Sequence, residues 1–76
     1  MDTEVIEFPL ESDYIELNQL LKLAGLCDSG GAGKALVAEG LVRVDGQPES
    51  RKTCKIRGGQ QVDCDGVTIR VLPQQA

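Results

Sequence analysis

The hydrophobic positions change their spacing along the chain, and these changes predict the order of the elements. Residues 3–8 (TEVIEF) are rich in strand-forming residues, and Pro9 is expected to end this strand. Further on, apolar residues recur at helical spacing, which predicts a helix over residues 14–24 with Ser12 or Asp13 at its cap. A strand followed by a helix is therefore expected at the start.

Polar residues define the other side of this first helix. Asn18, Gln19 and Lys22 are spaced so that they share one side, away from the leucines. Gly25 follows the last apolar position and is expected to end the helix, since a left-handed residue commonly does so.

A second helix is predicted over residues 29–39. Ser29 is a favourable N-cap, and Gly40 supplies a left-handed stop. We expect three of its residues to face inward: Ala32, Ala35 and Leu36. The small residues of this helix would let the two helices approach closely.

Two hairpins are predicted in the second half of the chain, because Asp-Gly suits a two-residue turn in which both central residues have positive φ. The first is residues 41–49 (LVRVDGQPE), whose return strand is limited by a proline. The second has strands near residues 62–64 and 67–72. The turns are Asp45-Gly46 and Asp65-Gly66, and the proline is Pro48. Residues 50–59 are expected to form a basic connection closed by Gly58-Gly59.

This order of elements predicts an α+β fold in which two short packed helices lie against a small, curved, mostly antiparallel sheet. The first strand is expected to pair with the last. We expect residues 1–76 to form a single domain, since a chain of this length supports only one core. Within it we distinguish an acidic N-terminal segment (1–13), a core (14–62) and a C-terminal strand and tail (63–76), whose last four residues, PQQA, are expected to fray.

The net charge of −4 conceals a strong asymmetry. Residues 1–16 carry six acids and no base, whereas residues 17–76 carry eight bases and six acids. Four of the bases lie within seven residues that contain no acid: Arg51, Lys52, Lys55 and Arg57. Such an asymmetry can mark a nucleic-acid surface despite an acidic total, although a short basic run can also be a solvated loop.

The glycine-rich turn in residues 27–40 (CDSGGAGKALVAEG) does not fit a nucleotide-binding P-loop. That motif needs GxxxxGK followed by Ser or Thr. Asp28 stands where the first glycine should be, and Ala35 stands where the hydroxyl should hold magnesium. ATP or GTP binding is therefore not expected.

The same turn suits a phosphate in another way. A helix N-terminus presents unpaired N–H groups and partial positive charge, so it attracts anions. Gly30 and Gly31 are expected to leave this end open, with Lys34 beside it. The alternative is a simple tight corner whose N–H groups are satisfied by Asp28.

Catalytic and metal chemistry find little support. The chain has no histidine, and its three cysteines form no CxxC pair, so neither the usual general base nor a zinc site is available. We expect no enzymatic activity, no metal and no cofactor, with the cysteines as reduced thiols partly packed in the core. No apolar run is long enough to span a membrane and the N-terminus is acidic, so we expect a cytoplasmic protein.

Residues 15–62 resemble the RNA-binding domain named after ribosomal protein S4, also called the alpha-L motif. The resemblance rests on the leucine-rich first helix, the SGG turn, the alanine-containing second helix, EGLVRVDG, and the basic stretch closed by RGGQQV. It covers 48 of 76 residues and is nearest to small bacterial stand-alone members of the family. It implies binding of structured RNA, ribosomal or transfer RNA, through the two helices and the following turn, in a translation- or ribosome-related role.

Carried over by position, the resemblance points to RNA-binding residues on the helical side, to a structural turn and to a basic loop. These are Lys22, Ser29, Gly30, Gly31 and Lys34; Val44, Asp45 and Gly46; and Arg51, Lys52, Lys55 and Arg57. Two places depart from the family pattern. Tyr14-Ile15-Glu16 stands where many members have Arg-Leu-Asp, and Ser29-Gly30 stands where many have Ser-Arg.

The leading interpretation is a monomeric, non-catalytic RNA-binding protein that contacts phosphates. Only Tyr14 and Phe8 are aromatic, so stacking of splayed bases is not expected. One alternative is a protein-interaction module that uses the acidic N-terminal surface. A ubiquitin-like sulfur carrier is another, but it would end in Gly-Gly, where this sequence has Gln74-Gln75-Ala76.

Overall fold

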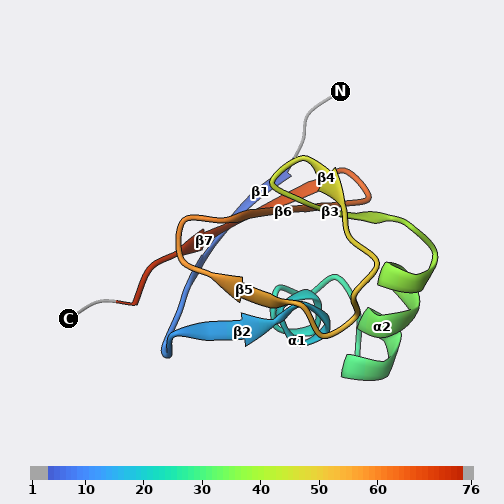
Figure 1. Cartoon of the computed structure of the whole chain (residues 1–76), viewed down its shortest axis with the longest axis horizontal. Helices are drawn as coiled ribbons and strands as arrows, with labels where there is room; N and C mark the ends of the chain where they lie inside the picture. Colours follow the sequence, from blue (N-terminus) through green and yellow to red (C-terminus); the bar gives the residue numbers. More distant parts are fainter. Residues whose placement is uncertain (1–3, 75–76) are drawn as a thin grey trace.

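The computed structural model describes residues 4–74 and contains two helices, a five-stranded sheet and a separate two-stranded ribbon. The elements in chain order are β1 (Glu4–Pro9), β2 (Tyr14–Glu16), α1 (Leu17–Leu23), α2 (Gly30–Ala38), β3 (Val42–Val44), β4 (Gln47–Pro48), β5 (Lys55–Arg57), β6 (Gln61–Cys64) and β7 (Val67–Leu72). In Figure 1 the large sheet runs across the top, with the β2–β5 ribbon and α1 beneath it and α2 at one end. The predicted α+β class is confirmed.

The large sheet has the order β1-β7-β6-β3-β4. Its first and last strands along the chain, β1 and β7, pair in parallel, and the other neighbours pair antiparallel. The expected pairing of the two ends is therefore confirmed. Pro9 lies within β1 rather than beyond it, which the sheet accommodates because β1 is an edge strand.

Both predicted Asp-Gly turns are present. The φ angles are 51° at Asp45 and 84° at Gly46, and 49° at Asp65 and 81° at Gly66, as two-residue hairpin turns require. The Asp45 carboxylate also accepts a hydrogen bond of 2.9 Å from the backbone N–H of Gln61, which ties the first turn to the start of β6.

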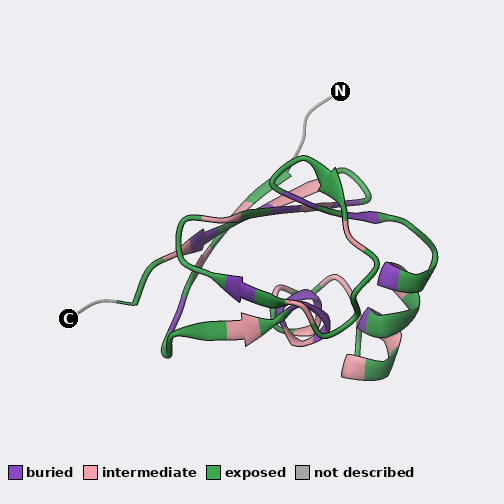
Figure 2. Ribbon diagram, viewed as in Figure 1, coloured by how far each residue is buried: buried purple, intermediate pink, exposed green. Residues whose placement is uncertain are grey.

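The hydrophobic core lies between the large sheet and α1, where buried residues from both are seen in Figure 2. Helix α1 contributes three fully buried leucines to the core, and α2 and β5 contribute the buried Val37 and Ile56. The remaining buried apolar residues are Leu10, Val42, Val44, Val62, Cys64, Ile69 and Val71. Within residues 4–74, half of the buried apolar residues therefore come from β3, β6 and β7 of the large sheet, and their burial stabilises the fold.

The predicted start of the first helix is wrong. Residues 14–16 form β2, which pairs antiparallel with β5, a strand inside the connection that was predicted to be a loop. Ile15 is half-buried and lies opposite the buried Ile56, with exposed residues on either side of each. This alternation places one apolar residue of each strand towards the core, which overrides the helical spacing that includes Ile15.

Helix α1 begins at Leu17 without a side-chain cap. Its first N–H groups instead donate to backbone carbonyls of the basic loop: Leu17 to Cys54 at 2.8 Å and Asn18 to Lys52 at 3.1 Å. Ser12, predicted as a cap, donates its hydroxyl to the carbonyl oxygen of Tyr14. Because these carbonyls satisfy the helix end, the basic loop and α1 are fixed to each other.

The second helix follows the prediction more closely. The Ser29 hydroxyl accepts a hydrogen bond of 3.1 Å from the N–H of Ala32, which confirms it as the N-cap. Gly25 and Gly40 have φ of 88° and 78° and end their helices as predicted. The inward position predicted for Ala35 is wrong, because Ala35 is exposed while Gly33 and Val37 are buried.

Two of the four residues predicted to fray make contacts with the rest of the domain. Pro73 packs against Gly58, where an added Cβ would overlap it, and Gln74 donates a side-chain hydrogen bond to the carbonyl oxygen of Glu11. Gln75 and Ala76 of the predicted tail, and Thr3 of the predicted first strand, lie outside the described residues.

The close contact between the helices occurs at Gly33 and Asn18. A Cβ at Gly33 would lie 2.5 Å from the backbone oxygen of Asn18 and 3.1 Å from its Cα. Asn18 is only 3% exposed, so its predicted place on the polar side of α1 is wrong. Because Gly33 has no side chain, α2 can approach α1 closely enough to bury Asn18.

We predict that Gly33→Ala destabilises the protein by about 1–3 kcal/mol. The new methyl group would meet backbone that cannot rotate away, which outweighs the gain of about 1 kcal/mol in helix propensity. Gly31→Ala is the matched control, because its Cβ would meet only the Ser29 hydroxyl, at 3.9 Å. We expect this control to be neutral or more stable by up to about 1 kcal/mol in urea unfolding. Equal stability of the two variants would contradict the assignment.

Candidate nucleic-acid interface

The predicted RNA-binding residues fall into two groups in the structure. The helix corner contains Lys22 on α1 and Ser29, Gly30, Gly31 and Lys34 at the start of α2. The basic loop and strand contain Arg51, Lys52, Lys55 and Arg57. Asn18 contacts both groups, because its side chain meets the start of α2 and its backbone meets the loop.

The helix corner is less open than predicted. Gly30 is half-buried against α1, and a Cβ there would lie 2.9 Å from the side-chain nitrogen of Gln19. Gly31 is exposed and has only the Ser29 hydroxyl nearby. The accessible part of this helix end is therefore at Gly31, whereas Gly30 serves the packing of α2 on α1.

Asn18 joins the corner to the basic loop. Its side-chain NH₂ donates to the carbonyl oxygen of Gly30 at 3.4 Å, and its backbone N–H donates to the carbonyl oxygen of Lys52. Its side-chain oxygen is buried and has no hydrogen-bond partner among the described residues. One buried residue thus sets the position of α2 and of the loop relative to α1.

The β2–β5 ribbon presents a cationic surface built on an aromatic ring. The Lys55 ammonium lies 4.9 Å from the centre of the Tyr14 ring, and the Arg57 guanidinium lies 5.6 Å from it. Both distances suit cation–π attraction. Tyr14 was missed as a site residue, although the matching alternation in residues 14–16 and 55–57 was a signal for paired strands.

Arg51 is already engaged by a carboxylate. Its guanidinium donates to both oxygens of Glu49, at 3.0 and 3.1 Å, and its backbone N–H donates to the same group at 2.9 Å. These hydrogen bonds, the side-chain ones first, lower the pKa of Glu49 to about 2. A phosphate at Arg51 would have to compete with Glu49, a residue that the sequence analysis did not single out.

The three remaining lysines are less constrained. Among residues 4–74, the side chains of Lys22, Lys34 and Lys52 form no hydrogen bond or ion pair with the protein. Lys34 and Lys52 are exposed, and Lys22 is half-buried. Their ammonium groups can therefore meet an anion without breaking an internal contact.

The thiols are placed as structural residues. Cys64 is buried, Cys27 and Cys54 are half-buried against the core, and burial raises the pKa of the Cys54 and Cys64 thiols. Three or more His, Cys, Asp or Glu groups suitable for a metal do not come together in the described part of the chain. Nor does either described helix have the length and hydropathy to cross a membrane.

This architecture, a helix pair beside a curved sheet with a basic loop hydrogen-bonded to the start of α1, defines a small α+β domain. Residues 8–72 match the S4 domain family. The match covers most of the chain, so the protein belongs to the S4 domain family, as the sequence resemblance predicted.

Individual relatives agree with this assignment. YbcJ of Escherichia coli strain K12 is 48% identical over 59 residues, which cover 78% of this chain and 84% of that protein. The probable ribosome maturation protein RlbA of Bacillus subtilis strain 168 is 35% identical over 57 residues, covering 75% and 80% of the two chains. A solution structure of E. coli YbcJ, described as revealing an alfaL motif involved in RNA-binding, matches with a TM-score of 0.68 and 45% identity over 87% of this chain and 85% of that one. The alpha-L fold is thereby confirmed.

The Glu49–Arg51 pair predicts a particular dependence of stability on pH. Because the folded-state pKa of Glu49 lies below its ordinary value of 4.5, its stabilising contribution is complete above about pH 5 and is lost as the pH falls towards 2. The free energy of unfolding of the native protein, minus that of Glu49→Gln, should therefore decrease between pH 5 and pH 2. Urea unfolding at several pH values measures this difference.

The control for this experiment replaces a carboxylate that forms no ion pair. Glu39 is exposed and forms no ion pair within residues 4–74. The difference in free energy of unfolding between the native protein and Glu39→Gln should change less with pH than the corresponding difference for Glu49→Gln. A difference for Glu49→Gln that is constant from pH 7 to pH 2 would show that the pair does not stabilise the fold.

Proposed function

We propose that this protein binds structured RNA, of the ribosomal or transfer RNA class, mainly through phosphate contacts. It acts by binding rather than by catalysis, as a monomer in the cytoplasm, in a process connected with translation or the ribosome. The RNA-binding residues are those of the helix corner and the basic loop and strand, with Arg51 in a secondary position because Glu49 holds it.

The observation that supports this proposal most is the capping of α1 by the basic loop. The carbonyl oxygens of Lys52 and Cys54 accept the first N–H groups of α1, so the loop has a fixed position on the helix. Cations from separate parts of the sequence are thereby held on one framework. Several fixed cations can replace counterions along an RNA backbone, which gives strong, salt-dependent binding.

The few aromatic rings favour phosphate and shape over base recognition. Tyr14 is 38% exposed, and two cations already lie near its ring. Phe8 is half-buried and lies in β1, whereas Tyr14 begins β2. An extended stacking platform for single-stranded bases is therefore not formed by these two residues, whereas helical RNA needs only correctly spaced phosphate contacts.

The relatives favour the same process. The YbcJ structure is described as containing a motif involved in RNA binding, and RlbA is named a probable ribosome maturation protein. Both proteins are covered over most of their length by this chain. A ribosomal RNA hairpin is therefore the first ligand to test.

We predict that Lys34→Gln combined with Lys52→Gln weakens binding to such a hairpin several-fold at low salt. One lysine comes from each group, and each lost phosphate contact should reduce the salt dependence of log K by about one unit. Titration of a fluorescently labelled RNA at two salt concentrations measures both effects. A single-stranded RNA of equal length should bind more weakly than the hairpin.

The matched control is Arg43→Gln combined with Arg70→Gln, which removes the same charge from the large sheet. Both arginines are exposed, and Arg70 lies 3.8 Å from Glu7 across β1 and β7. This control should retain most of the affinity. The proposal is wrong if the native protein shows no binding at low salt, or if the two double variants lose equal affinity.

A further inference from the structure

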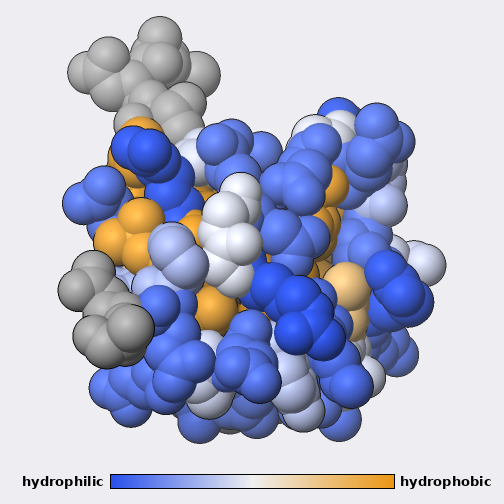
Figure 3. All heavy atoms as spheres, turned by 60° about the vertical axis from the view of Figure 1, so that its left-hand side comes forward, coloured by the Kyte–Doolittle hydropathy of each residue, from blue (hydrophilic) through white to orange (hydrophobic). Residues whose placement is uncertain are grey.

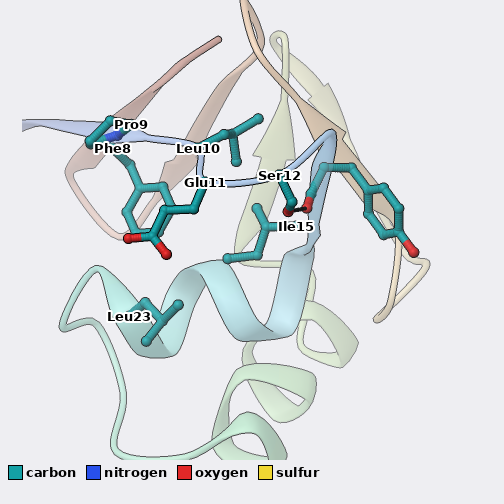
Figure 4. Close-up of a pocket in the computed structure, with 8 residues that line it drawn as sticks. Phe8, Pro9, Leu10, Glu11, Ser12, Ile15 and Leu23 are labelled. Carbon is teal, nitrogen blue, oxygen red and sulfur yellow. Dashed lines mark hydrogen bonds between the residues drawn. The ribbon is translucent and has the colours of Figure 1, made fainter. Parts of the chain in front are cut away.

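A hollow of about 550 Å³ lies between the β1–β2 connection and the C-terminal part of α1. We call it the apolar groove; it is lined by Phe8, Pro9, Leu10, Glu11, Ser12, Tyr14, Ile15 and Leu23. Figure 4 shows Phe8 of β1, Ile15 of β2 and Leu23 of α1 directed towards a common space. Its volume is in the range of clefts that bind ligands in proteins.

The groove leaves apolar surface uncovered. Leu23, on the α1 side, is 58% exposed, whereas Leu10 on the opposite wall is 6% exposed and belongs to the core. On the face shown in Figure 3, hydrophobic surface occurs in patches between hydrophilic side chains. A large exposed leucine beside a hollow with an apolar wall is typical of a surface that binds another apolar group.

The charge at the groove restricts what that group can be. The Glu11 side chain extends alongside Phe8 towards Leu23, so its carboxylate lies at the opening (Figure 4). Within residues 4–74 this carboxylate forms no ion pair, and the first 16 residues contain six acids and no base. A phosphate backbone would be repelled here, whereas a lysine or arginine on an apolar stem would complement both the charge and the wall.

We propose that the apolar groove binds an extended segment of a partner protein in which a large apolar residue adjoins Lys or Arg. The apolar side chain lies between Phe8 and Leu23, and the cation pairs with Glu11. This inference does not depend on RNA binding by the basic groups. It gives the acidic N-terminal segment a binding role in addition to its place in the sheet.

The position of the groove adds a consequence. Tyr14 lines the groove and also lies against Lys55 and Arg57 on the ribbon. A partner segment in the groove would therefore lie next to RNA bound at the ribbon. The protein would bring a basic protein segment and an RNA together at one edge.

The test uses the full ¹⁵N-labelled chain and a short capped peptide in which Lys alternates with Leu. We expect amide shift changes concentrated at residues 8–15 and at Leu23. Two further peptides separate the contributions: one with Glu in place of Lys, and one with Ser in place of Leu. Neither should bind appreciably, because each lacks one of the two complementary features.

Variants with matched controls locate the binding. Leu23→Ser and Glu11→Gln should each weaken peptide binding, by about tenfold for the leucine because its apolar contact is lost. The controls Leu41→Ser and Glu39→Gln change an exposed leucine and an exposed carboxylate outside the groove and should bind normally. All four should unfold at nearly the native temperature, since Leu23 and Leu41 are 58% and 46% exposed.

The proposal is overturned if the peptide causes no amide shift changes at the groove, or if the peptide with Ser in place of Leu binds equally well. It is also overturned if Leu23→Ser binds the peptide normally, or if amide shifts at the groove change when the protein is diluted without peptide. The last would identify a second copy of the chain as the occupant. RNA titration of Leu23→Ser separates the two functions. Normal RNA affinity with lost peptide binding is expected, and loss of both in a folded variant would place the groove in the RNA interface instead.

Discussion

The contact between Gly33 and the backbone of Asn18 is the constraint on which the binding surface depends. It sets the distance between the two helices, because any side chain at Gly33 would meet Asn18 backbone. Burial of Asn18 in turn directs its amide to α2 and its backbone N–H to the basic loop. A contact with no charge of its own therefore determines where the cations lie.

The fold also organises charge. Residues 4–9 of the acidic N-terminal segment are part of the sheet, because β1 pairs along its whole length with β7, and Glu7 lies 3.8 Å from Arg70. Lys55 and Arg57, by contrast, lie on β5 of the two-stranded ribbon, which is not part of the large sheet. Such separation lets an acidic protein present a local surface of the opposite sign.

The sequence was informative where local chemistry decides structure. The Asp-Gly turns, the Ser29 cap and the glycine ends of the helices depend on a few adjacent residues, and the structure has them as predicted. The β2–β5 ribbon was missed because its strands are three residues each and lie far apart in sequence, so only their pairing stabilises them. Asn18 was misplaced for a similar reason, since its burial depends on a glycine in another helix. For the candidate site, positions and charges could be predicted, but the engagement of Arg51 by Glu49 and the Tyr14 ring beneath two cations required the folded arrangement.

Strand β7 lies between β1 and β6 in the large sheet. The first strand along the chain therefore pairs with the last one. During synthesis, β1 has no strand to pair with until β7 (Val67–Leu72) has left the ribosome, whereas the β3–β4 hairpin pairs residues that are close in sequence. Closure of the sheet is thus a late, long-range event, of the kind that slows folding relative to local pairing. The acidic strand would meanwhile remain extended and charged, which disfavours its association with other unfinished chains.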